Sequence, residues 1–171
     1  METFEVKRGL AKKLASEGGL AGVASKHFDN IDGDGDAFTG NHGIMTSISG
    51  EYNALGKLVV DVSQVLPDFK DEDAMIAAND DRRRWSAFLD EATGYNSKQR
   101  GDKAKEVAKK AAKAKSGISQ ARHFMDMATN LSDETRAQAE EFITTIEGLL
   151  EAGDNTKAES TAKKLGALLE P

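Results

Sequence analysis

The 171-residue sequence contains no cysteine and only two prolines, and aromatic residues make up 6% of it. Without cysteine the chain forms no disulfide bonds, zinc–thiolate sites or thiol nucleophiles. Because proline breaks helices, its scarcity leaves room for long ones. No stretch of the sequence approaches the roughly 20 apolar residues that a membrane-spanning helix needs. These absences favour a helical protein without thiol chemistry.

The first thirteen residues carry charges throughout and have no apolar core, so they do not match a secretory signal peptide. The lack of cysteine is typical of proteins in reducing compartments and also of many virion proteins. We therefore expect the protein in the cytoplasm, or within a virion or another assembled particle.

Apolar residues recur at helical spacing over most of the chain, which predicts an all-α fold. One stripe predicts a helix over 43–66 that ends before Pro67; it consists of Ile44, Ile48, Tyr52, Leu55, Val59, Val62 and Leu66. A second stripe predicts a helix over 71–93, with Ile76 and Phe88 on its apolar face. Beyond a turn at 94–97, three further stripes predict antiparallel helices between 98 and 169.

We expect these helices to pack as a multi-helix bundle, because helices with one apolar stripe and short turns do so. Residues 1–96 would form an N-terminal helical part with one Asp/Gly-rich loop at 28–43 and the two long helices. Residues 97–171 would form a C-terminal antiparallel array of three helices. The two parts would make one continuous domain.

The loop at 28–43 is the candidate metal site. Asp32, Asp34 and Asp36 are spaced two residues apart, and Ca²⁺ takes carboxylate ligands from such spacing on a tight loop. The same residue types build ordinary turns, so a solvated loop without an ion is the alternative. His27 and His42 flank the loop, and we interpret both as surface residues.

The loop resembles that of an EF-hand, which would make Ca²⁺ the cofactor. In the register that begins at Asp32, the sixth position is Ala37 and the twelfth is Gly43, where the family has glycine and a bidentate glutamate. In the register that begins at Asn30, Gly35 falls at the sixth position, but the twelfth is Asn41. Neither register supplies the closing glutamate, so the resemblance predicts weak Ca²⁺ binding.

The net charge of −6 is unevenly distributed along the chain. Residues 1–96 carry a net charge of −7, residues 97–115 carry +6, and residues 116–171 carry −5. The basic segment is a candidate surface for nucleic acid or an acidic partner; its residues are Lys98, Arg100, Lys103, Lys105, Lys109, Lys110, Lys113 and Lys115. It has no aromatic residue for base stacking, which favours a solvated or acid-paired helix over nucleic-acid binding.

No arrangement of residues in the sequence indicates catalysis, so we expect a protein that is not an enzyme. The alternation of acidic and basic segments favours a structural or assembly protein, working through protein–protein contacts and self-association in an oligomer or larger particle. Two alternatives stay open: an EF-hand-like Ca²⁺-binding protein, and a nucleic-acid-associated protein that uses the basic helix at 98–115. No membrane partner is expected.

Overall fold

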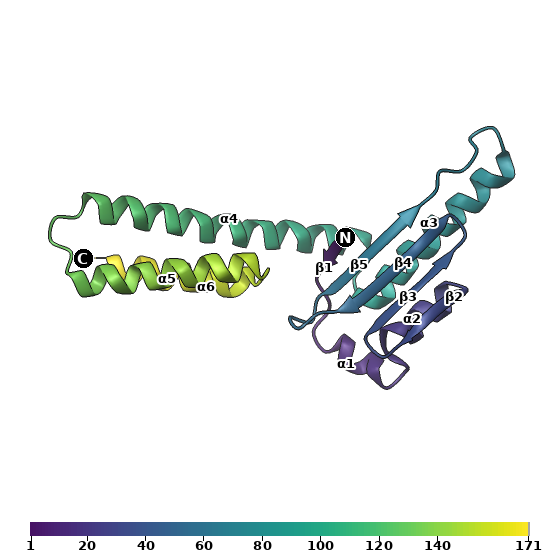
Figure 1. The fold of residues 1–171 in the computed structure, drawn as a ribbon, viewed down its shortest axis with the longest axis horizontal. Coiled ribbons are helices and arrows are strands. Elements are labelled where there is room, and N and C mark those ends of the chain that lie inside the picture. Colours follow the sequence, from purple (N-terminus) through teal and green to yellow (C-terminus); the bar gives the residue numbers. More distant parts are fainter. Residues whose placement is uncertain (171) are drawn as a thin grey trace. The chain divides into compact units, whose positions relative to one another are not determined.

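A computed structural model describes residues 1–170 of the chain. The chain divides into two compact units, unit 1 from Met1 to Asp102 and unit 2 from Lys103 onward. All β-strands among the described residues belong to unit 1, whereas unit 2 is helical (Figure 1). One long helix, α4 (Ser97–Met127), begins in unit 1 and continues into unit 2.

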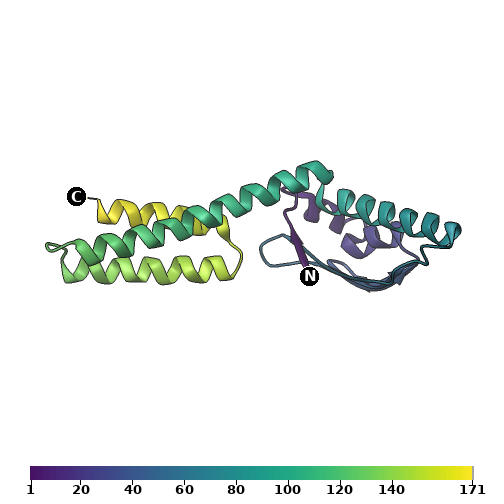
Figure 2. The same ribbon diagram turned by 90° about the horizontal axis from the view of Figure 1, so that it is seen from above.

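Unit 1 is built around a five-stranded antiparallel sheet with strand order β1-β5-β4-β3-β2. Its strands are β1 (Glu2–Phe4), β2 (Asn30–Asp34), β3 (Ala37–His42), β4 (Met45–Tyr52) and β5 (Leu58–Gln64). Its helices before α4 are α1 (Leu10–Ala15), α2 (Gly19–His27) and α3 (Glu72–Thr93). The three helices lie on one side of the sheet, as Figure 2 shows, and we call the opposite side the open face.

The sheet overturns the prediction of an all-α bundle. The segment 43–66, expected to be one helix, forms the hairpin of β4 and β5, and the loop 28–43 forms the hairpin of β2 and β3. The reason lies in the spacing, because residues four apart share one face of a helix and also one face of a strand. Ile48 and Tyr52 therefore fit both patterns, whereas the β-branched run Val59–Val60 favours a strand.

A tight turn at Gly35 and Asp36 forms the β2–β3 hairpin. Asp34 pairs with Ala37, so only two residues connect the strands. Gly35 has a φ of 64°, which suits glycine at the first central position of a two-residue hairpin turn. An aspartate–glycine run therefore makes a hairpin here, and residues 30–42 do not form the continuous loop that an EF-hand has.

Aromatic side chains fill the core between the helices and the sheet. Phe88 of α3 lies against Phe28, with ring centroids 5.3 Å apart, and against Phe38 of β3 at 5.4 Å. Gly50 lies directly opposite Phe38 on β4, and its missing side chain leaves room for the ring. Trp85 packs at the edge of this cluster, 5.4 Å from Phe88. Such rings contribute much of the buried apolar area of a core.

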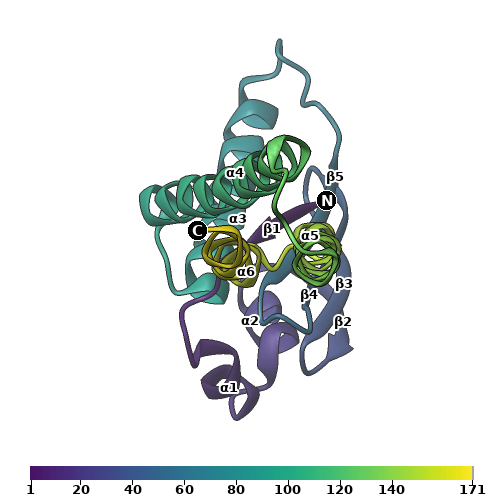
Figure 3. The same cartoon turned by 90° about the vertical axis from the view of Figure 1, so that its left-hand side faces the viewer.

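Unit 2 contains the helices that the sequence predicts for the C-terminal part. The later turns of α4 pack with α5 (Asp133–Glu151) and α6 (Asn155–Leu169), and α5 and α6 lie side by side (Figures 1 and 3). Ser132 caps α5 by accepting a hydrogen bond from the Thr135 amide. Ile118, Ile143 and Leu165 bring the three helices together in one buried cluster.

Candidate functional site

The predicted metal ligands lie on the β2–β3 hairpin and do not surround a common point. Asp32 and Asp34 are exposed on β2, whereas Asp36 lies in the turn. Alternate strand residues share one face, so Asp32 and Asp34 both point away from the helices. Within residues 1–170, no three histidine or carboxylate side chains gather closely enough to hold a metal ion. Cation binding by the three aspartates stays a prediction.

The two aspartates on β2 belong to rows of side chains that cross the open face. The first row joins Asp32, Thr39, Ser49 and Asp61 as direct cross-strand neighbours on β2, β3, β4 and β5. The second row joins Asp34, Ala37, Glu51 and Val59 on the same four strands. The two rows hold four carboxylates and two hydroxyls and contain no lysine or arginine.

A hollow of about 470 Å³ lies over these rows. Asp32, Asp34, Glu51 and Asp61 line it. Asp61 forms an ion pair with the amino group of Met1 at 3.0 Å, whereas the other three carboxylates form no ion pair within the described residues. The open face of unit 1 is therefore acidic, hydroxyl-rich and slightly hollowed.

The predicted basic residues all lie on α4, but they differ in what they contact. Lys103 and Lys110 form ion pairs with Glu106, at 3.0 and 3.3 Å, and their hydrogen bonds lower the pKa of that carboxyl. Lys113 pairs with Glu159 of α6 at 3.2 Å. These three lysines therefore face acidic neighbours, as the acid-paired interpretation of the basic segment expects.

Lys98, Lys105 and Lys109 form an exposed row on α4 that we call the lysine stripe. Their separations of seven and four residues place them on one side of the helix. Lys98 and Lys109 form no ion pair within residues 1–170. Lys98 and Lys109 thus expose cationic groups on this side of the helix, and the use of the stripe for nucleic acid or an acidic partner stays a prediction.

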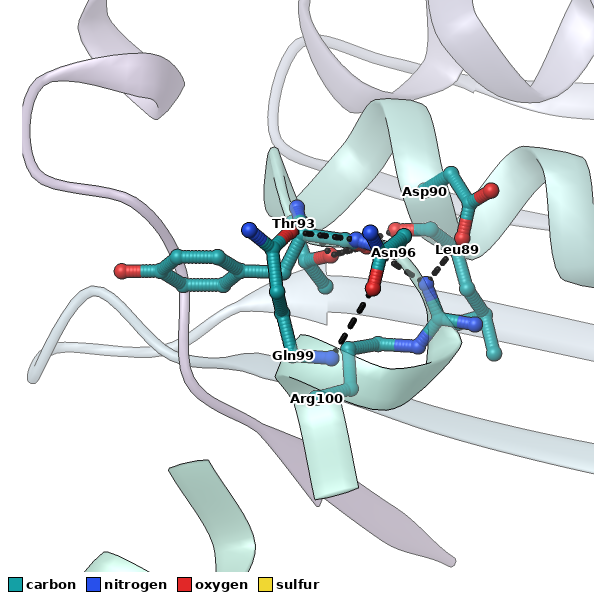
Figure 4. A network of polar contacts seen from close by, with 7 residues as sticks. Leu89, Asp90, Thr93, Asn96, Gln99 and Arg100 are labelled. Atoms are coloured by element: carbon teal, nitrogen blue, oxygen red, sulfur yellow. Dashed lines mark hydrogen bonds and ion pairs between the residues drawn. The ribbon is translucent and has the colours of Figure 1, made fainter. Parts of the chain in front are cut away.

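Of the two other basic residues, Lys115 is exposed further along α4, and Arg100 lies at the connection between α3 and α4 (Figure 4). Arg100 is only 8% exposed; its guanidinium pairs with Asp90 and donates to the Tyr95 carbonyl at 2.6 Å. Asn96 and Gln99 exchange backbone-to-side-chain hydrogen bonds of 3.0 and 2.9 Å in the first turn of α4. This reciprocal pattern fixes where α4 begins. Arg100 therefore holds the fold and does not present its charge to a ligand.

His42 was expected at the surface, but it is 9% exposed beneath the β3–β4 turn. Its Nδ1 accepts a hydrogen bond from the Asp29 amide at 3.2 Å, and its Nε2 lies 3.3 Å from Oδ1 of Asp81. Oδ2 of Asp81 accepts a hydrogen bond from the Ile44 amide at 2.8 Å. Asp81 therefore joins α3 to the end of β3 and to the β3–β4 turn, and no pattern in the sequence pointed to Asp81 as the partner of His42.

A second polar contact joins α2 to α3. Glu91 accepts hydrogen bonds from Lys26 at 2.9 Å and from His27 at 2.8 Å. Burial alone would raise the pKa of Glu91, but the hydrogen bonds and charges of Lys26 and His27 outweigh it and lower that pKa. The carboxylate thus stays charged where the two helices meet.

Tyr52 at the end of β4 donates a hydrogen bond of 2.6 Å to the Ala92 carbonyl of α3. Burial raises the pKa of Tyr52 to about 12, with further contributions from the negative charges of Asp36 and Glu91. The hydroxyl therefore serves as a neutral donor that ties the sheet to α3.

The loop between β5 and α3, together with the first turns of α3, exposes large apolar side chains. We call Val65, Leu66, Phe69 and Ile76 the apolar tip; they are 53%, 78%, 69% and 55% exposed. Figure 1 shows this loop extending beyond the end of the sheet. Leu66 and Ile76 were expected on the buried faces of helices, and both expectations are wrong.

Among residues 1–170, no helix combines the length and the apolar character that crossing a membrane requires. A family model described as a domain of unknown function (DUF5611) matches residues 1–106. No curated protein and no solved structure matches the chain. The matched segment covers unit 1 and the first turns of α4.

Proposed function

The chain belongs to the DUF5611 family, and we propose that it is a non-enzymatic assembly protein that acts through protein–protein contacts. The contact that we propose first is the association of the chain with copies of itself. The observation that carries this proposal is the apolar tip of unit 1. Monomeric proteins rarely expose several large apolar side chains next to one another, and such patches mark interaction surfaces.

The backbone that presents the tip is held in place. The Val65 amide donates to the Ile44 carbonyl at 2.9 Å, which continues the pairing of β5 with the start of β4. Asp68 accepts a hydrogen bond of 2.9 Å from the Lys70 amide within the loop. A surface that is already ordered loses little conformational entropy on binding. The apolar side chains are therefore positioned for contact before a partner arrives.

Burying Leu66 and Phe69 supplies enough free energy for a measurable association. A fully buried leucine or phenylalanine contributes about 1.5–3 kcal/mol relative to an exposed one. Two such side chains contribute roughly 3–6 kcal/mol, which corresponds to a change of about 100-fold or more in an association constant. Salt screens charges and does not weaken apolar contact, so this association should persist at high ionic strength.

Light scattering of the full chain over a range of concentrations tests the proposal. We expect a mass above the monomer mass of 18.4 kDa for the native sequence, and a return toward that mass for the Leu66→Ser, Phe69→Ser double variant. Leu55→Ser is the matched control, because Leu55 is also an exposed leucine, at 42%, but lies in the β4–β5 turn. A monomer at every concentration and salt, or unchanged association of the double variant, would overturn the proposal.

A further inference from the structure

We infer that the open face of unit 1 is a docking surface for the lysine stripe of a second copy of this chain. The inference rests on the proposed function insofar as both require self-association, but it concerns a different surface and a different force. The apolar tip acts by burial of apolar area, whereas the open face acts by charge.

The acidic side of this contact is a sheet face that no other element of unit 1 covers (Figure 2). Asp32, Asp34 and Glu51 are exposed there and form no ion pair within the described residues. Thr39 and Ser49 lie between them in the cross-strand rows and add hydrogen-bonding groups. Carboxylates and hydroxyls accept hydrogen bonds from lysine ammonium groups, which have three donors each.

The basic side is a helix surface on the same chain. The lysine stripe lies on the exposed side of α4, opposite positions such as Ala114 and Ile118 that pack in the core. Lysine side chains are long and flexible, so their ammonium groups can reach into a shallow hollow. A helix laid over the hollow would place cationic groups above Asp32, Asp34 and Glu51, which have no counter-charge within the described residues.

The two surfaces agree in size. Lys98 and Lys109 are eleven residues apart, which is about 16 Å along a helix that rises 1.5 Å per residue. Asp32 and Asp61 are separated by three strand spacings, or about 14 Å across the sheet. A helix that crosses the strands can therefore place one outer lysine over Asp32 and the other near Asp61, which also pairs with the Met1 amino group.

The negative charge of the open face determines which kind of partner can bind there. The open face repels nucleic acid, anionic lipid and another open face, because all of these are negative. The stripe is a basic surface that this same chain supplies whenever two copies meet, on a helix long enough to cross the sheet. Because the acidic and basic surfaces differ, the contact is heterologous. Repeated contacts of this kind close into a ring of molecules or extend into a filament.

Charge-reversed variants of the full chain test this inference. The face variant carries Asp32→Lys, Asp34→Lys and Glu51→Lys; the stripe variant carries Lys98→Glu, Lys105→Glu and Lys109→Glu. A control variant carries Glu140→Lys, Glu141→Lys and Glu151→Lys on the exposed side of α5, which changes the net charge as much as the face variant does. Circular dichroism checks that each variant is folded. Association is measured by sedimentation at about 0.01 M and about 1 M salt, where screening is weak and strong.

We expect the face and stripe variants each to lose at least about tenfold in association at low salt, and the control to keep it. An equimolar mixture of the two variants should associate again, because the native face of one meets the native stripe of the other. A chain that carries all six changes should also associate.

Equal low-salt association of the native chain and both single-surface variants would overturn the inference, as would failure of the mixture to recover. If salt-resistant association through the apolar tip persists in that case, the proposed function stands and only this contact is refuted. If the native chain is monomeric under all conditions, both proposals fail.

Discussion

Replacing Gly43 by alanine should destabilise unit 1 by about 2.5–5 kcal/mol. Gly43 has a φ of 53°, in the left-handed region, where a side chain costs about 1–2 kcal/mol. An added methyl group would also lie within 2.7 Å of both carboxylate oxygens of Asp81. Asp81 is 7% exposed and would have to move away, although the Ile44 amide and His42 depend on it.

The second part of that cost comes from the displaced carboxylate. A hydrogen bond to a charged group contributes about 1.5–3 kcal/mol, and a buried carboxylate that loses its partner is costly. The backbone and carboxylate contributions together give the stated total. Gly56→Ala separates them, because Gly56 has a φ of 72° but no atom near an added methyl group. Its cost should be the backbone part alone, about 1–2 kcal/mol.

Urea unfolding followed by tryptophan fluorescence measures both variants. Trp85 is the only tryptophan and packs against Phe28 and Phe88, so its emission reports on unit 1. The midpoint for Gly43→Ala should lie well below that for Gly56→Ala. Equal destabilisation of the two variants, within about 0.5 kcal/mol, would refute the role assigned to Asp81.

Two pH-dependent predictions concern the contacts of α3. The raised pKa of Tyr52 stabilises the folded protein fully below its ordinary value of 10.0, and this contribution is lost as the pH rises through about 12. In a Tyr95→Phe background, ultraviolet absorbance should show tyrosine ionisation near 12, and a transition centred at 10.0 in the folded protein would contradict the burial of Tyr52. The lowered pKa of Glu91 acts in the opposite sense. Its contribution to the stability of the folded protein is complete above the ordinary pKa of 4.5 and is lost as the pH falls through the lowered pKa. Glu91→Gln should therefore lower the free energy of unfolding by about 1 kcal/mol at neutral pH and by much less in acid. Urea unfolding at the two pH values measures this difference, and an equal loss at both would exclude the explanation.

The helices from residue 71 onward could be predicted from the sequence because several signals agree there. Asp71 and Ser132 stand at helix starts, and the side chain of each caps its helix. Alanine, lysine and glutamate dominate the segments that follow, and all three favour helices. Where composition, spacing and capping point the same way, local preference and tertiary packing give the same structure.

The sheet could not be predicted from apolar spacing alone, since Ile48 and Tyr52 fit a strand and a helix equally well. The valines of β5 and the glycines of both hairpins were the available signals. The open face was only partly foreseeable. Asp32 and Asp34 were singled out as ligands. That Glu51 and Asp61 lie in the same rows follows from strand register, which a prediction of helices does not include.

The order of the strands leaves β2 at one edge of the sheet, where unpaired backbone groups could attract a strand from another molecule. The strand is only five residues long, has a glycine at its fourth position, and carries Asp32 and Asp34. Short length, charge and glycine each discourage strand addition at an edge. Negative charges at this edge would also repel the same edge of another copy. The aspartates therefore discourage strand addition at this edge and leave the broad face of the sheet available for side-chain contact.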